Sequence, residues 1–177
     1  MGDSDIALLS VAELSLMLKG RDLSPVEVTQ AYLKRIRKID PALNSYITVA
    51  ADEAMKAAAE AELEITKGTF RGPLHGIPVA VKDQMWTKGI RTTNASTLLK
   101  NFVPDEDAAV VSGLKNAGAV LLGKLNLSEF ALGESFHHPA GTPRNPWDLS
   151  RNPGISSSGS AAATGAFLCA ASLGEDT

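Results

Sequence analysis

Residues 76–83 read GIPVAVKD, and this stretch decides the class of the fold. It is a short, β-branched run that ends abruptly in charge, a pattern typical of a strand buried inside a sheet. Lys82 closes the run and Asp83 follows it. We therefore expect a buried strand that presents a lysine side chain at its last position.

Helical and strand patterns alternate around this strand. Residues 107–119, DAAVVSGLKNAGA, predict a helix, and residues 120–124, VLLGK, predict a second strand. Upstream, residues 45–49, SYITV, predict a further short strand. Strands that alternate with helices indicate an α/β fold, in which helices pack against a sheet.

The first third of the chain is predicted to be largely helical. Ser10 and Glu13 have the spacing of a capping box, and Gly20 is placed to end that first helix. A third helix is predicted from about residue 51 to residue 66, because the segment is rich in alanine and glutamate.

The helix between these two has the strongest start signal. Ser24 is the expected N-cap, Pro25 occupies the first helical position and Glu27 completes the capping box. An apolar stripe of helical period follows. The Asp-Pro pair at residues 40–41 is expected to close this helix.

The last third is less regular. Residues 126–132, NLSEFAL, predict one or two helical turns, and residues 133–155 carry four prolines and predict a long loop. Residues 160–171 predict a helix of small residues, and the end of the chain resembles a strand that enters a loop.

The overall composition excludes several classes of protein. The chain has 177 residues, a net charge of −3 and one cysteine, Cys169, so it has neither a basic surface for nucleic acid nor an internal disulfide. No apolar run approaches a membrane span, and the N-terminus does not resemble a signal peptide. We expect one cytoplasmic domain, divided into a helical opening segment (1–70) and the start of an α/β core (71–177).

Lys82 is the first candidate for chemistry. A lysine at a strand end is usually a solvated charge, which is the structural alternative. The apolar run before Lys82 instead places its stem near the interior, where loss of water disfavours the ammonium form. A neutral amine there would be a general base.

The serine cluster at residues 156–158 is the second candidate. One serine is enough to cap a helix, so an N-cap with turn-forming neighbours is the structural explanation. The functional explanation is that hydroxyls at a glycine-rich turn into a helix relay a proton or attack a carbonyl.

Other patterns predict no site. Ser112 and Lys115 match a serine–x–x–lysine pattern, but the companion motifs of penicillin-binding proteins are absent. His137 and His138 are adjacent and lack the spacing of a metal pair, and His75 is interpreted as a turn residue. No phosphate loop or dinucleotide fingerprint occurs, so we expect neither a metal nor a cofactor.

Five long motifs, taken together, resemble the amidase signature family: residues 76–83, residues 107–133, GTPRNPWDLSRNPG (141–154), SSSGSAAA (156–163) and SLGEDT (172–177). The helical segment of residues 9–36 resembles the opening of the same family. The resemblance covers practically the whole chain and implies the amidase signature fold, in incomplete form, with helices followed by part of a mixed sheet.

The resemblance also implies roles for individual residues. In that family a lysine, a serine after a cis peptide bond and a nucleophilic serine form a relay. Lys82 corresponds to the base and Ser156 to the cis-serine. Ser157 and Ser158 would orient Ser156 and cap the helix, and Thr177 would begin the loop whose N–H groups stabilise the oxyanion.

The sequence departs from the family at two points. The family usually has Gly-Gly-Ser before the cis bond, whereas this chain has Gly154-Ile155-Ser156; we still expect a cis Ile155–Ser156 bond. The family's nucleophile follows the position of Thr177, which is the last residue of this sequence. The chain is therefore expected to be an N-terminal fragment that is inactive on its own.

Three functions remain open. The first is an amidase that hydrolyses a small carboxamide through an acyl-enzyme. The second is the A subunit of a glutamyl-tRNA amidotransferase, and the third is a truncated remnant without catalysis. We expect a small-molecule amide substrate and no direct contact with nucleic acid or membrane. The expected protein partner is a second copy of the chain or, for the second function, other subunits.

Overall fold

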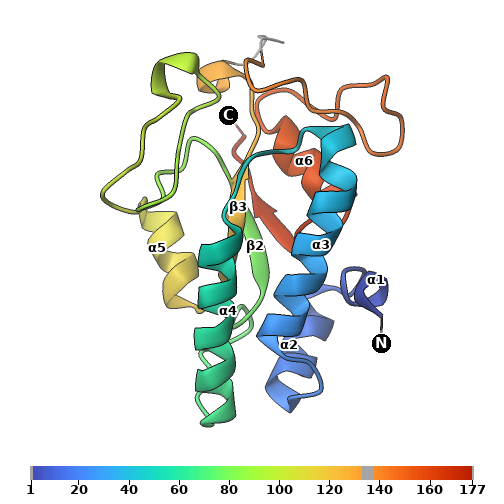
Figure 1. The fold of residues 1–177 in the computed structure, drawn as a ribbon, viewed down its shortest axis with the longest axis vertical. Coiled ribbons are helices and arrows are strands. Elements are labelled where there is room, and N and C mark those ends of the chain that lie inside the picture. Colours follow the sequence, from blue (N-terminus) through green and yellow to red (C-terminus); the bar gives the residue numbers. More distant parts are fainter. Residues whose placement is uncertain (1, 133–137, 177) are drawn as a thin grey trace.

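The computed structural model describes residues 2–132 and 138–176. Figure 1 shows its helices arranged around a central sheet. In chain order the elements are α1 (Asp3–Ile6), α2 (Val11–Gly20), α3 (Pro25–Leu43), β1 (Tyr46–Val49), α4 (Ala51–Thr66), β2 (Pro78–Lys82), η1 (Thr97–Leu99), α5 (Ala109–Asn116), β3 (Val120–Leu125), η2 (Glu129–Ala131), α6 (Ser158–Gly165) and β4 (Ala171–Leu173).

The four strands form one mixed sheet in the order β1–β3–β2–β4. β2 is parallel to both of its neighbours, whereas β1 runs antiparallel to β3. β2 and β3 are buried along their whole length, as strands covered on both faces must be. The expected α/β class, with opening helices followed by a mixed sheet, is confirmed.

Helices pack against this sheet and against one another. Helices α3 and α4 pack against each other and against β3, while α6 packs against β2, β3 and β4. In the view of Figure 1, α4 and α5 lie to the left of β2 and β3, and α3 and α6 lie to the right. One cluster of buried apolar side chains joins helices and sheet.

The parallel pairing of β2 with β4 determines where polar groups meet. Val81 pairs with Leu173, so the residues that follow both strands emerge at the same edge of the sheet. Lys82 is the last residue of β2, and Glu175 comes shortly after β4. The carboxyl ends of parallel strands are where α/β proteins commonly place their sites.

Gly159 lets α6 approach this edge closely. A Cβ atom at residue 159 would lie 2.4 Å from the Asn126 nitrogen and 2.6 Å from the Ser45 carbonyl oxygen. The Gly159 N–H donates instead to the Asn126 carbonyl at 2.9 Å. The start of α6, with the serines before it, is thereby held against the end of β3.

The predicted starts of the long helices are confirmed. Both Ser10 and Ser24 accept a hydrogen bond from the backbone N–H of the glutamate three residues later, and that glutamate reaches back to the serine N–H. The strand over residues 46–49 and the helix over residues 51–66 are also present where the sequence predicts them.

One predicted helix end is confirmed and another is wrong. Helix α2 ends at Gly20, as predicted, and the next residue, Arg21, takes the left-handed conformation of the cap with φ of 65°. Pro41 lies inside α3, which continues to Leu43 and ends at the left-handed Asn44. A proline so near the end removes only its own N–H bond, and the Asn44 N–H closes the last turn on the Asp40 carbonyl at 2.8 Å.

The late helix is shorter than predicted and begins earlier. α6 starts at Ser158 and ends at Gly165, because Phe167 turns left-handed with φ of 57°. The chain then enters β4, as the strand-like end of the sequence predicts. Residues 126–132 contain a single 3₁₀ turn, η2, and residues 138–155 form a loop without helix, as expected.

Within the described ranges, no helix has both the length and the apolar character needed to cross a bilayer.

Candidate active site

Lys82 is completely buried at the end of β2, and its ammonium group has three polar partners. Lys82 Nζ lies 3.1 Å from Ser156 Oγ, 3.1 Å from Ser157 Oγ and 3.0 Å from Glu175 Oε1. We call these four residues the lysine–serine cluster. Ser156 is 74 positions away in sequence, so only the tertiary fold brings the two side chains together.

Ser157 joins the loop after β4 to the start of α6. Its hydroxyl donates to the Glu175 carbonyl at 3.0 Å and accepts from the Glu175 N–H at 3.1 Å. The residue precedes α6 but its side chain caps no helical N–H. The expectation that Ser157 caps the helix is therefore wrong, because its hydroxyl is already bonded to Glu175 and Lys82.

Ser158 is the first residue of α6 and is fully buried. Its hydroxyl has no hydrogen-bond partner among the described residues. Ser158 therefore makes no hydrogen bond with the lysine–serine cluster through its side chain.

The Ile155–Ser156 bond is trans, since none of the described peptide bonds is cis. This contradicts the expected cis bond. The trans form of a bond that does not involve proline is favoured by about 3–4 kcal/mol, and the β-branched Ile155 adds crowding to the cis form.

Glu175 is the member of the cluster that the sequence did not predict. Its carboxylate forms an ion pair with Lys82 and accepts from Gln84 Nε2 on its other oxygen. The hydrogen bond from Lys82 lowers the pKa of Glu175, and that from Gln84 lowers it further. The parallel pairing of β2 with β4 was the signal that could have placed Glu175 beside Lys82.

A second buried lysine supports the loop behind Lys82. Lys124 and Asp83 are both fully buried, with Lys124 Nζ 3.6 Å from Asp83 Oδ1. Lys124 also donates to the Met85 carbonyl at 2.6 Å and to Thr92 Oγ1 at 2.7 Å, and Asp83 accepts from Thr93 N–H at 2.8 Å. Burial lowers the pKa of Lys124 to about 8 and raises that of Asp83.

Two of the other sequence candidates, Thr177 and His137, fall outside the described residues. The remaining ones have partners other than the members of the cluster. His138 is buried with Nδ1 3.0 Å from the Leu127 carbonyl oxygen, and Lys115 pairs with Asp107 at 2.8 Å. His75 lies in a turn, as interpreted, where its Nδ1 accepts from the Arg71 N–H at 3.1 Å.

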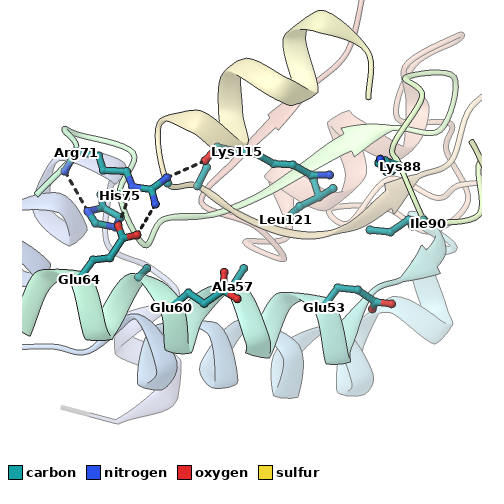
Figure 2. A pocket seen from close by; sticks show the side chains of 14 residues that line it. Glu53, Ala57, Glu60, Glu64, Arg71, His75, Lys88, Ile90, Lys115 and Leu121 are labelled. Atoms are coloured by element: carbon teal, nitrogen blue, oxygen red, sulfur yellow. Dashed lines mark hydrogen bonds and ion pairs between the residues drawn. The ribbon is translucent and has the colours of Figure 1, made fainter. Parts of the chain in front are cut away.

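A pocket of about 480 Å³ lies between α4 and the segment that carries α5 and β3. Figure 2 shows its acidic wall on α4 and, at one end, the contacts of Glu64 with Arg71 and His75. No serine, threonine or cysteine lines it, and no member of the lysine–serine cluster does. The candidate chemistry therefore belongs to the cluster and not to this pocket.

A metal centre is not formed by the described part of the chain, which contains no group of three or more His, Cys, Asp or Glu side chains arranged to hold an ion. The groups present at the lysine–serine cluster are an amine, hydroxyls and a carboxylate, and these are suited to proton transfer.

Comparison with known proteins gives one consistent result. The family model described as Amidase matches residues 27–177. The A subunit of the glutamyl-tRNA(Gln) amidotransferase of Geobacter metallireducens is 54% identical over 170 residues, which cover 96% of this chain and 35% of the relative.

Solved structures give the same result. The native peptide amidase of Stenotrophomonas maltophilia is 42% identical with a TM-score of 0.86, over 92% of this chain and 35% of that one. A fatty acid amide hydrolase is 30% identical with a TM-score of 0.92, over 98% of this chain and 31% of that one. The chain spans about 35% of the length of the curated relatives it matches.

Proposed function

We propose that this chain, which belongs to the amidase signature family, contributes the base and the relay serine of an amide hydrolase. One observation carries the proposal: the buried Lys82 Nζ lies 3.1 Å from Ser156 Oγ. A lysine amine enclosed with hydroxyls is suited to proton transfer, because bulk water does not compete for its lone pair.

In the proposed reaction, neutral Lys82 takes the proton of the Ser156 hydroxyl. Ser156 takes the proton of a nucleophilic serine, which lies beyond residue 177 in the family pattern. That serine attacks the amide carbonyl to form an acyl-enzyme, and ammonia or an amine leaves with a proton returned through the relay. Water then hydrolyses the acyl-enzyme.

Other residues have supporting parts in this proposal. Ser157 holds the loop after β4 in place, and Thr177 begins the loop that stabilises the oxyanion. Residues 1–177 are the N-terminal portion of a single domain that continues past the nucleophile. Residues 1–177 alone are expected to hydrolyse no amide.

The second candidate is the A subunit of a glutamyl-tRNA amidotransferase, which frees ammonia from glutamine and acts with partner subunits. The 54% identity to such a protein favours it. Both candidates use the same relay, so they differ in substrate and partners and not in the chemistry of Lys82. A remnant without catalysis is the third.

The test is ammonia release from a panel of carboxamides that includes glutamine. It uses the longest natural reading frame that contains these residues, with Lys82→Ala and Lys82→Met. The methionine variant keeps the packing of the lysine stem while removing the base. We expect both substitutions to lower kcat by about 100-fold or more. Lys34→Ala, at an exposed ion pair with Asp3, is the control and should retain full activity.

The outcomes separate the candidates. Ammonia release from several carboxamides by the chain alone supports the stand-alone amidase. Ammonia release from glutamine alone, and only when other subunits co-purify, supports the amidotransferase. Equal rates for the wild type and both Lys82 variants would overturn the relay.

A further inference from the structure

Glu175 shares Lys82 with the two serines, and its position has a consequence for the proposed relay. Its carboxylate lies 3.0 Å from Lys82 Nζ, and its side chain is about one-third exposed, at 36%. Gln84 Nε2 donates to the other carboxylate oxygen. The Ser157 hydroxyl forms hydrogen bonds with both the N–H and the carbonyl of Glu175, so the backbone of Glu175 is held in place as well as its side chain.

We propose that Glu175 is a positioning residue for Lys82, one that orients the amine toward Ser156. The inference rests on the proposed function, because it concerns the same base.

The orientation follows from the hydrogen-bond capacity of the amine. A lysine ammonium has three donors, and Lys82 has three acceptors around it: Ser156, Ser157 and Glu175. After one proton leaves to solvent, two N–H groups remain. Glu175 and Ser157 accept from these two, so the lone pair is left facing Ser156 Oγ, from which the relay requires it to take a proton.

The neighbouring elements bring few other charges to the cluster. Asp83 follows β2 but pairs with Lys124 of β3, and Asp176 is adjacent to Glu175 in sequence. Helix α6 and β4 contribute no carboxyl, amine or imidazole group. Among the described residues, Glu175 is thus the carboxylate that forms an ion pair with Lys82.

Two substitutions separate charge from orientation. Glu175→Gln removes the charge but keeps an oxygen that accepts from Lys82, and Gln84 can turn its amide to suit. We expect Glu175→Gln to keep kcat within a few-fold of wild type, because an acceptor for Lys82 remains. Glu175→Ala removes that acceptor, so kcat should fall by about 10-fold with KM unchanged.

Glu64→Gln is the matched control, because it removes one carboxylate from an ion pair with Arg71 remote from the cluster. It should leave both kcat and KM unchanged. Circular dichroism and thermal unfolding verify that each variant folds.

Rescue by the conservative variant is the readout that a merely structural role would not give. An equal kcat in the wild type and Glu175→Ala, or an equal loss in Glu175→Gln and Glu175→Ala, would overturn the role of Glu175, even if Lys82→Ala abolishes activity. Full activity of Lys82→Ala would instead overturn the proposed function.

Discussion

Two buried lysines on neighbouring strands have different surroundings, and this difference separates a candidate base from a structural cation. Lys82 faces two hydroxyls and a partly exposed carboxylate at the edge of the sheet. Lys124 faces a backbone carbonyl, a threonine and the fully buried Asp83. Both amines have a hydroxyl neighbour, but that of Lys124 belongs to the buried Thr92, whereas Lys82 lies 3.1 Å from Ser156, the serine of the proposed relay.

The Lys124–Asp83 pair predicts a change of stability with pH. The pKa of Lys124 is lowered from 10.5 to about 8 by burial, so between these values the unfolded chain binds more protons than the folded one. The free energy of unfolding should then rise from about pH 8 to about pH 10.5, by on the order of a few kcal/mol. Urea unfolding at a series of pH values measures this slope.

The double variant Asp83→Asn with Lys124→Met is the control for this dependence of the free energy of unfolding on pH. It removes both buried charges together, so neither remains without its partner. The part of the slope that Lys124 contributes should disappear. A slope equal to that of the wild type would show that Lys124 titrates normally in the folded chain.

At the scale of elements, the start of α6 is the feature that positions Ser156 and Ser157. Gly159→Ala should destabilise the chain by about 1–3 kcal/mol, because the new Cβ would meet backbone atoms of Asn126 at 2.4 and 2.5 Å, and backbone cannot move aside as a flexible side chain does. It should also displace Ser156 and lower the rate of the amide hydrolysis proposed for the longer chain.

Gly113→Ala in α5 is the matched control for this substitution. A Cβ at Gly113 meets nothing within 4 Å, and the position is inside a helix. Alanine there should raise the free energy of unfolding by about 0.5–1 kcal/mol and leave activity unchanged. Thermal unfolding of the two variants side by side tests the claim, and equal stabilities would contradict it.

Across the whole molecule, the described residues include several exposed large hydrophobic side chains. Large hydrophobic side chains are exposed at Trp147 (85%), Leu98 (83%) and Leu132 (64%). In the described ranges β4 pairs with β2 alone, which leaves its other edge without a strand. Exposed apolar groups and open strand edges both favour association.

Residues 1–177 expressed alone should therefore bind a hydrophobic dye and form soluble aggregates. Dye fluorescence and light scattering, compared with the longer natural chain, measure this. A monodisperse fragment with a cooperative melt and no dye binding would contradict the expectation.

Local signals in the sequence determined most of the elements. Capping boxes at Ser10 and Ser24, the composition of residues 51–66 and the apolar run ending at Lys82 predicted elements that the structure contains. The end of α3 was predicted less well, because a helix end depends on which groups donate hydrogen bonds to the last free carbonyl oxygens, as the Asn44 N–H does to Asp40.

The α/β class and the buried strand of Lys82 could be predicted from the residues alone, and the serine partner of Lys82 from the family resemblance. The contact of Glu175 with Lys82, the bond of Ser157 to the loop after β4 and the pairing of Lys124 with Asp83 emerge only once the chain is folded. These contacts depend on strand order and on the approach of α6 to β3, and such pairing between distant segments leaves no local pattern along the chain.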